Sequence, residues 1–142
     1  MKIYFDNAAT TRVFDQSSQA AAKAMTEEYF NPSSPYADAL NVEKKIDSAR
    51  DTIKKNLNLK GDIIFTAGGS ESNNLAIKGA LSKMRKSKII TSEIEHPSVR
   101  KTCEQAAKDL GFPIAVLPVD KKGHVIKEAL HNACKDTESA LV

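Results

Sequence analysis

The segment between Val42 and Leu57 places apolar residues on one side of a helix. Its apolar positions are Val42, Ile46, Ala49, Ile53 and Leu57, separated by steps of four, three, four and four. Charged residues fill most of the positions between them. This spacing is typical of an amphipathic helix that packs against a core. We therefore expect one long helix here.

Short apolar runs elsewhere predict β-strands. The runs are residues 63–65, 88–91, 114–117 and 139–142, and the first is expected to be buried on both faces. Helices are expected from Asp15 or Ser17 to about Tyr29, after residue 70, from Pro97 to Leu110 and near residues 126–133. Alternation of strand and helix predicts an α/β domain with a mostly parallel sheet.

A pair of glycines follows the first of these strands, within the sequence Thr-Ala-Gly-Gly-Ser-Glu-Ser-Asn-Asn at residues 66–74. Gly68 and Gly69 permit positive φ and a close approach of a ligand, and Ser70 is suited to cap the next helix, with Asn73 three residues on. Free amides and the helix dipole would then meet at one point, which suits a phosphate. The same residues fit an ordinary capped helix start, so the motif alone leaves both interpretations open.

Composition narrows the classes of function. The net charge is +3 over 142 residues and the basic residues are scattered, so a nucleic-acid surface is not indicated. No apolar run is long enough to span a bilayer, and the opening residues lack the apolar stretch of a signal peptide. Two cysteines are too few for a disulfide framework. We expect a cytoplasmic protein with no membrane contact.

Four motifs together resemble those of cysteine desulfurases, the pyridoxal-phosphate enzymes of the class V aminotransferase family. They are residues 3–11 (Ile-Tyr-Phe-Asp-Asn-Ala-Ala-Thr-Thr), 31–34 (Asn-Pro-Ser-Ser), the glycine turn, and 91–97 (Thr-Ser-Glu-Ile-Glu-His-Pro). Gly69 and Ser70 stand where the family more often has alanine and threonine, but the amide and the hydroxyl are kept. The resemblance covers essentially the whole chain and implies part of the type I pyridoxal-phosphate transferase fold, truncated, with helices on both faces of the sheet.

The resemblance also implies roles for single residues. Gly69 and Ser70 would anchor the cofactor phosphate, and His96 would stack on the cofactor ring and move protons, which makes it the catalytic candidate. The substrate side would be lined by Asn7, Ala8 and Thr10, with Asn31 close to it or at a dimer contact.

The family also has parts for which this sequence holds no match. These are a cofactor-bearing lysine in a Ser-x-His-Lys pattern, an aspartate for the pyridine nitrogen and a persulfide-forming cysteine. We therefore interpret the chain as the N-terminal portion of a desulfurase. Residues 1–35 would form an N-terminal arm and helix with substrate-side loops, and residues 36–142 the first part of the large cofactor-binding domain. Alone, the chain is expected to bind the cofactor weakly or not at all and to be inactive.

The parent enzyme would convert L-cysteine to L-alanine and leave persulfide sulfur on the protein for iron–sulfur cluster or thiocofactor assembly. Its partners would be a sulfur acceptor or scaffold protein and a second copy in a homodimer. The residues leave other classes open, namely another class V enzyme such as a selenocysteine lyase or an aminotransferase, and a non-catalytic phosphate-binding or interaction module.

The two cysteines could be assigned roles as a metal ligand or as a nucleophile. His131 and Cys134 have the spacing of two metal ligands on one helix face, but no second pair completes a tetrahedral set, so no metal site is expected. Cys103 falls on the helix after His96 and is expected to be a buried helix residue, not a sulfur-accepting nucleophile.

Overall fold

The computed structural model describes residues 3–85, 87–135 and 137–142. It divides the chain into two compact units, Met1–Ile64 and Phe65–Val142. Each unit is described by itself below. The division at residue 35 expected from the motifs stays a prediction.

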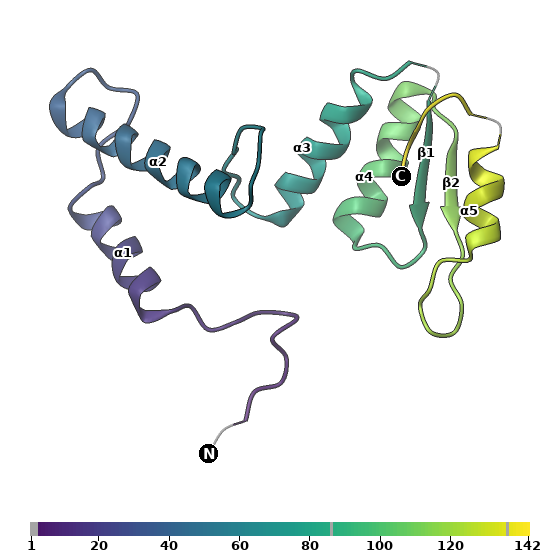
Figure 1. Cartoon of the computed structure of the whole chain (residues 1–142), viewed down its shortest axis with the longest axis horizontal. Helices are drawn as coiled ribbons and strands as arrows, with labels where there is room; N and C mark the ends of the chain where they lie inside the picture. The colour runs from purple at the N-terminus through teal and green to yellow at the C-terminus, as the bar shows by residue number, and fades with distance from the viewer. Residues whose placement is uncertain (1–2, 86, 136) are drawn as a thin grey trace. The chain divides into compact units, whose positions relative to one another are not determined.

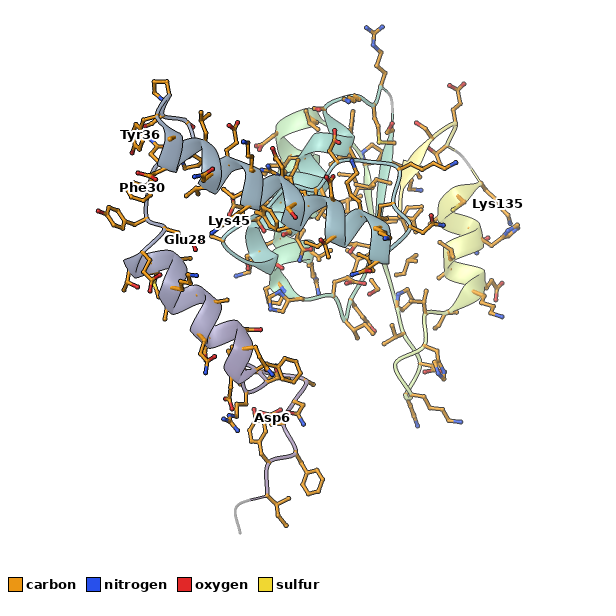
Figure 2. The ribbon with its side chains drawn as sticks, turned by 60° about the vertical axis from the view of Figure 1, so that its left-hand side comes forward. Asp6, Glu28, Phe30, Tyr36, Lys45 and Lys135 are labelled. Carbon is orange, nitrogen blue, oxygen red and sulfur yellow. The ribbon has the colours of Figure 1, made fainter. Side chains whose placement is uncertain are left out.

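The first unit contains α1 (Asp15–Thr26) and α2 (Ala37–Asn56). Both helices were expected, and α2 begins five residues before Val42. Lys45 of α2 lies 2.6 Å from the carboxylate of Glu28, just after α1, and the two side chains face each other in Figure 2. The hydrogen bond from Lys45 holds the pKa of Glu28 below its ordinary value. This ion pair joins the end of α1 to α2 within the unit.

The second unit alternates helices and strands. Its elements are α3 (Gly69–Leu81), β1 (Lys88–Ser92), α4 (Pro97–Leu110), β2 (Ile114–Leu117), α5 (Lys127–Cys134) and β3 (Ala140–Leu141). The three strands form one parallel sheet in the order β2-β1-β3. Ile89 of β1 pairs with Ile114 on one side and Leu141 on the other.

Helices cover both faces of this sheet. Successive side chains of β1 point in opposite directions, so neighbouring residues of β1 pack against different helices. Ile89 packs with Leu81 at the end of α3 and with Cys103 of α4. Ile90 packs with Leu117 and Ala133 on the face covered by α5. Figure 1 shows α4 and α5 on opposite sides of the strands. The expected α/β fold, with a parallel sheet between helix layers, is confirmed.

The boundaries of α4 follow from local signals. Pro97 occupies its first turn, where the missing N–H costs nothing. Gly111 ends the helix in the left-handed conformation, with φ 67°, and its N–H bonds to Ala107 O. Both ends agree with the prediction from sequence.

The strand expected at residues 63–65 is absent. Ile64 is 69% exposed and Phe65 51% exposed, in a segment without regular structure. No strand of the described residues pairs with this segment. A strand needs neighbours for its ladder hydrogen bonds, so an apolar run without a neighbour does not become one.

Candidate functional site

The N-terminus of α3 carries the glycine turn. Gly68 is the residue before the helix, and its φ of 173° is ordinary extended backbone. Neither Gly68 nor Gly69 uses the positive φ that glycine permits, and the prediction of Ser70 as the cap is wrong because Gly68 occupies that position. Ser70 is the second residue of the helix, and the turn is held instead by Glu71, whose carboxylate accepts from Ala67 N–H at 2.7 Å.

The first turn of α3 nevertheless has open donors. The first N–H groups of a helix have no intrahelical acceptor, which applies to Gly69 and Ser70. The Ser70 hydroxyl has no hydrogen-bond partner among the described residues. A Cβ added at Gly68 or Gly69 would meet nothing within 4 Å, so the backbone can be approached closely. These groups suit an anion at the positive end of the helix dipole.

His96 lies at the end of the loop that leaves β1. Ser92 at the end of β1 donates to the carboxylate of Glu95 at 2.9 Å, which braces this loop. The backbone carbonyl of His96 accepts from Val99 N at 2.8 Å and from Arg100 N at 3.1 Å. His96 is thus the N-cap of α4, and its ring is exposed. The loop and the helix start together fix where the imidazole stands.

The imidazole is joined to α3 through one serine. His96 Nδ1 accepts from the backbone N–H of Ser98 at 3.1 Å and lies 2.8 Å from the Ser98 hydroxyl. The side-chain amide of Asn73, on α3, donates to the same hydroxyl at 2.8 Å. The N-terminal halves of α3 and α4 therefore lie side by side. This brings together the helix that carries Gly69 and Ser70 and the ring of His96.

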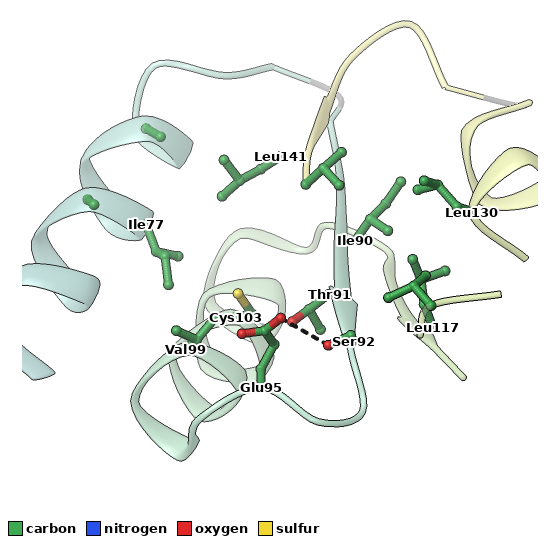
Figure 3. A pocket seen from close by; sticks show the side chains of 14 residues that line it. Ile77, Ile90, Thr91, Ser92, Glu95, Val99, Cys103, Leu117, Leu130 and Leu141 are labelled. Carbon is green, nitrogen blue, oxygen red and sulfur yellow. Dashed lines mark hydrogen bonds between the residues drawn. The ribbon is translucent and has the colours of Figure 1, made fainter. Parts of the chain in front are cut away.

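A cavity of about 610 Å³ lies next to this loop. Figure 3 shows Ile77, Val99, Cys103 and Leu141 among the residues that line it, together with Thr91 of β1. β3 pairs only with Lys88 and Ile89, and the cavity follows the part of β1 beyond them. The buried Thr91 hydroxyl has no hydrogen-bond partner among the described residues. The cavity is mainly apolar, so it does not resemble a phosphate site.

The remaining predicted residues belong to the first unit. Asn7, Ala8 and Thr10 lie in a loop closed by the Tyr4 hydroxyl, which is within 2.9 and 3.0 Å of the carbonyl oxygens of Asp6 and Thr10. Asn31 forms a turn in which its side chain accepts from Ser33 N–H at 3.0 Å. Their assignment to the substrate side stays a prediction.

The cysteines differ in their surroundings. Cys103 is buried in the core between α4 and β1, and this burial raises the pKa of its thiol above the ordinary value. It is a core residue, as expected. Cys134 is exposed. Within the described part of the chain, no three His, Cys, Asp or Glu residues gather as a metal site would require.

Sequence reasoning missed Ser98 and the true partner of Asn73. The sequence suggests a capping pair of Ser70 and Asn73, but the Asn73 amide bonds to Ser98 on α4 instead. The signal was present in the order His-Pro-Ser at residues 96–98, because a ring at the N-cap can accept from the second N–H of the helix.

The comparisons with known proteins extend over nearly all of this chain. The model of the family described as Aminotransferase class-V matches residues 3–142. The chain belongs to the class V aminotransferase family. Among the similar curated proteins, the cysteine desulfurase IscS of Dictyoglomus turgidum is 43% identical over 96% of this chain and 35% of its own length. The cysteine desulfurase NifS of Azotobacter vinelandii is 40% identical over 87% of this chain and 31% of its own length.

Similar solved structures agree with these relatives. One described as a NifS-like protein superposes with a TM-score of 0.85 at 33% identity, over 99% of this chain and 39% of its own. Another, described as SspA in complex with cysteine, has a TM-score of 0.79 at 32% identity, over 94% of this chain and 39% of its own. The chain thus spans about a third of the length of the curated relatives it matches.

The residues of this chain can be compared with what the phosphate and the ring of pyridoxal phosphate require of a binding site. The open amides and hydroxyl at the start of α3 suit its phosphate, and the exposed imidazole offers a flat face for its ring. Both elements lie in one unit and are joined through Ser98. The residues present therefore fit the phosphate and the ring, whereas a lysine in the Ser-x-His-Lys pattern is not in this sequence.

No helix in the described ranges is both long enough and apolar enough to cross a membrane.

Proposed function

We propose that this chain is the N-terminal part of a cysteine desulfurase that converts L-cysteine to L-alanine and protein-bound persulfide sulfur. The main support is the junction of the α3 N-terminus with His96, within a chain that resembles cysteine desulfurases along nearly its whole length. The cysteine in the complex of a similar protein supports the choice of substrate. The sulfur would serve iron–sulfur cluster or thiocofactor assembly, in the cytoplasm.

In this proposal each group has a task that follows from its chemistry. When bound, pyridoxal phosphate supplies an electron sink for the substrate's breaking bonds. The amides of Gly69 and Ser70 and the Ser70 hydroxyl would hold its phosphate at the positive end of α3. His96 would stack on its ring, and the imidazole could give or take a proton near neutral pH. Asn7, Ala8 and Thr10 would line the substrate side, and Asn31 would lie close to it or at the contact with a second copy of the enzyme in a homodimer.

The parts that complete the reaction would come from sequence beyond the matched third of the enzyme. The cofactor-bearing lysine and the persulfide-forming cysteine of the family have no counterpart among residues 1–142. The parent enzyme would pass its sulfur to an acceptor or scaffold protein. We propose that the chain alone has no desulfurase activity and holds pyridoxal phosphate only weakly.

A chimaeric enzyme tests this proposal. The N-terminal stretch of the Dictyoglomus turgidum enzyme that matches this chain is replaced by residues 1–142, and alanine formation from L-cysteine is measured with pyridoxal phosphate. We expect a chimaera that forms alanine and loses this activity at least about a hundredfold on His96→Ala, as for loss of a positioned acid–base group. The chain alone serves as the inactive comparison.

Two results would contradict the proposal. A folded chimaera that carries the cofactor but forms no alanine would show that this chain cannot serve as the first third of a desulfurase. Alanine formation by residues 1–142 alone, above a heat-treated control, would show that the missing lysine and cysteine are not needed.

A further inference from the structure

We infer that Ser98 and Asn73 are positioning residues that hold the neutral ring of His96 in one tautomer, with its proton on Nε2. The inference rests on three hydrogen bonds. Two lead from Asn73 on α3 through the Ser98 hydroxyl to the ring, and the third joins the backbone N–H of Ser98 to the ring. The tautomer itself does not depend on the proposed function, but its use in catalysis does.

The backbone of Ser98 decides which ring nitrogen is free of hydrogen. Its N–H points at His96 Nδ1 from 3.1 Å, and a backbone N–H can only donate. A proton on Nδ1 would therefore face another donor hydrogen. In a neutral imidazole one nitrogen is a donor and the other an acceptor, so Nδ1 accepts and Nε2 carries the proton.

The side chains of Ser98 and Asn73 strengthen this preference. The Asn73 amide nitrogen, a donor only, lies 2.8 Å from the Ser98 oxygen, which must accept from it. The Ser98 hydroxyl then keeps its own hydrogen for His96 Nδ1, at 2.8 Å. Because hydrogen bonds in a chain polarise one another, the amide on α3 makes the hydroxyl a better donor to the ring.

This arrangement couples the two proposed cofactor contacts. Asn73 follows Ser70 by three residues on α3, so both side chains belong to neighbouring positions of one helix face. The opposite ring atom, Nε2, has no partner among the described residues, and the ring is exposed. If the proposed function holds, the proton that His96 presents to a bound cofactor and substrate is therefore the one on Nε2.

The tautomer is measurable in residues 1–142 by ¹⁵N NMR of the imidazole nitrogens, with His96 identified by the loss of its signals in His96→Gln. We expect the Nε2–H form at a pH where the ring is neutral. His124 gives an internal comparison, because its Nδ1 lies 3.3 Å from the Asp120 carboxylate and is expected to carry the proton.

Single substitutions separate the effects of the Ser98 and Asn73 side chains on the tautomer ratio of His96. Ser98→Ala keeps the backbone N–H but removes the hydroxyl, and we expect the Nδ1–H form of His96 to rise about fivefold, the worth of one ordinary hydrogen bond. Asn73→Ala should act in the same direction with a smaller change, and Ser98→Thr should restore the parent ratio. Asn74→Ala is the matched control, because its amide bonds to Ser70 O and does not reach Ser98.

An Nδ1–H ring in the parent chain, or an unchanged ratio in both Ser98→Ala and Asn73→Ala, would overturn the inference. In the chimaeric enzyme, Ser98→Ala should lower kcat for alanine formation and Ser98→Thr should recover it, while Ser82→Ala at the far end of α3 should not change it. An inactive parent chimaera contradicts the proposed function alone. An active chimaera whose kcat is unchanged by Ser98→Ala contradicts the catalytic use of the tautomer.

Discussion

The carboxylate of Glu93 accepts a hydrogen bond from the backbone N–H of Val119 at 2.9 Å, across 26 residues of sequence. Glu93 also donates its own N–H to Leu117 O at 3.0 Å. One residue therefore ties the loop after β1 to the end of β2. That loop leads directly to His96, so the tie helps to set the position from which the ring acts.

Removing this tie should destabilise the second unit modestly. We expect Glu93→Ala to lower the free energy of unfolding by about 1 kcal/mol, because the bond is exposed and water can replace it in part. Glu93→Gln keeps an acceptor oxygen and should lose less. Denaturant unfolding of the full chain measures both, and equal losses in the two variants would show that the carboxylate does not act through this bond.

Two glycines should respond to alanine with opposite signs. Gly111 has φ 67°, which alanine adopts only with strain, so Gly111→Ala should destabilise the chain by about 1 kcal/mol. Gly79 lies inside α3 with open space around it, so Gly79→Ala should stabilise the chain by up to about 1 kcal/mol. Thermal unfolding compares them directly. A shift of the same sign in both would contradict the backbone assignments.

The two thiols should react at different rates with an alkylating reagent. Cys134 is exposed, whereas Cys103 is 4% exposed and the pKa of its thiol is raised by burial. Because the thiolate is the reactive form, the native chain should show one fast and one slow site. Cys134→Ser should abolish the fast phase and Cys103→Ser should leave it. Equal rates in the native chain would mean that the core around α4 opens readily.

The lowered pKa of Asp120 predicts in which direction the stability of the fold around it changes with pH. Hydrogen bonds from the backbone N–H groups of His124 and Lys122 hold the pKa of Asp120 below its ordinary value of 3.8. A carboxyl group with a lowered pKa in the folded state stabilises that state above the unfolded pKa. This stabilisation is lost as the pH falls through the folded value. We therefore expect the His124 and Lys122 amides to lose exchange protection below pH 3.8. The same protection in Asp120→Ala would contradict this.

The elements that sequence predicted well are those determined by neighbouring residues. α4 has its proline at the start and its glycine at the end, and both act through the local backbone. β1 and β2 were recognisable because a run of apolar residues between helical segments has few alternatives in an α/β domain. The motif at residues 91–97 likewise placed His96 next to a helix start.

What sequence could not supply depends on distant partners. Whether Ile64 and Phe65 join a sheet depends on a neighbouring strand, which the apolar run itself does not reveal. Ser70 is not the capping residue because the helix begins two residues earlier than expected, at Gly69, and Glu71 reaches back to Ala67. The amide of Asn73 found its acceptor 25 residues away, a pairing that no local pattern encodes.

The central place of β1 in the sheet has a consequence for the order of folding. Ile89 meets Ile114 on one side and Leu141 on the other, so the loop to β3 is about twice as long, which adds about 0.6 kcal/mol of closure entropy. Only two residues of β3 pair with β1 to offset this entropy. In contrast, β2 pairs with β1 over four residues and also packs against α4. We expect β1, α4 and β2 to assemble first and β3 to join last. During refolding, the amide of Ile89, bonded to Pro113 O, should become protected before that of Lys88, bonded to Ser139 O.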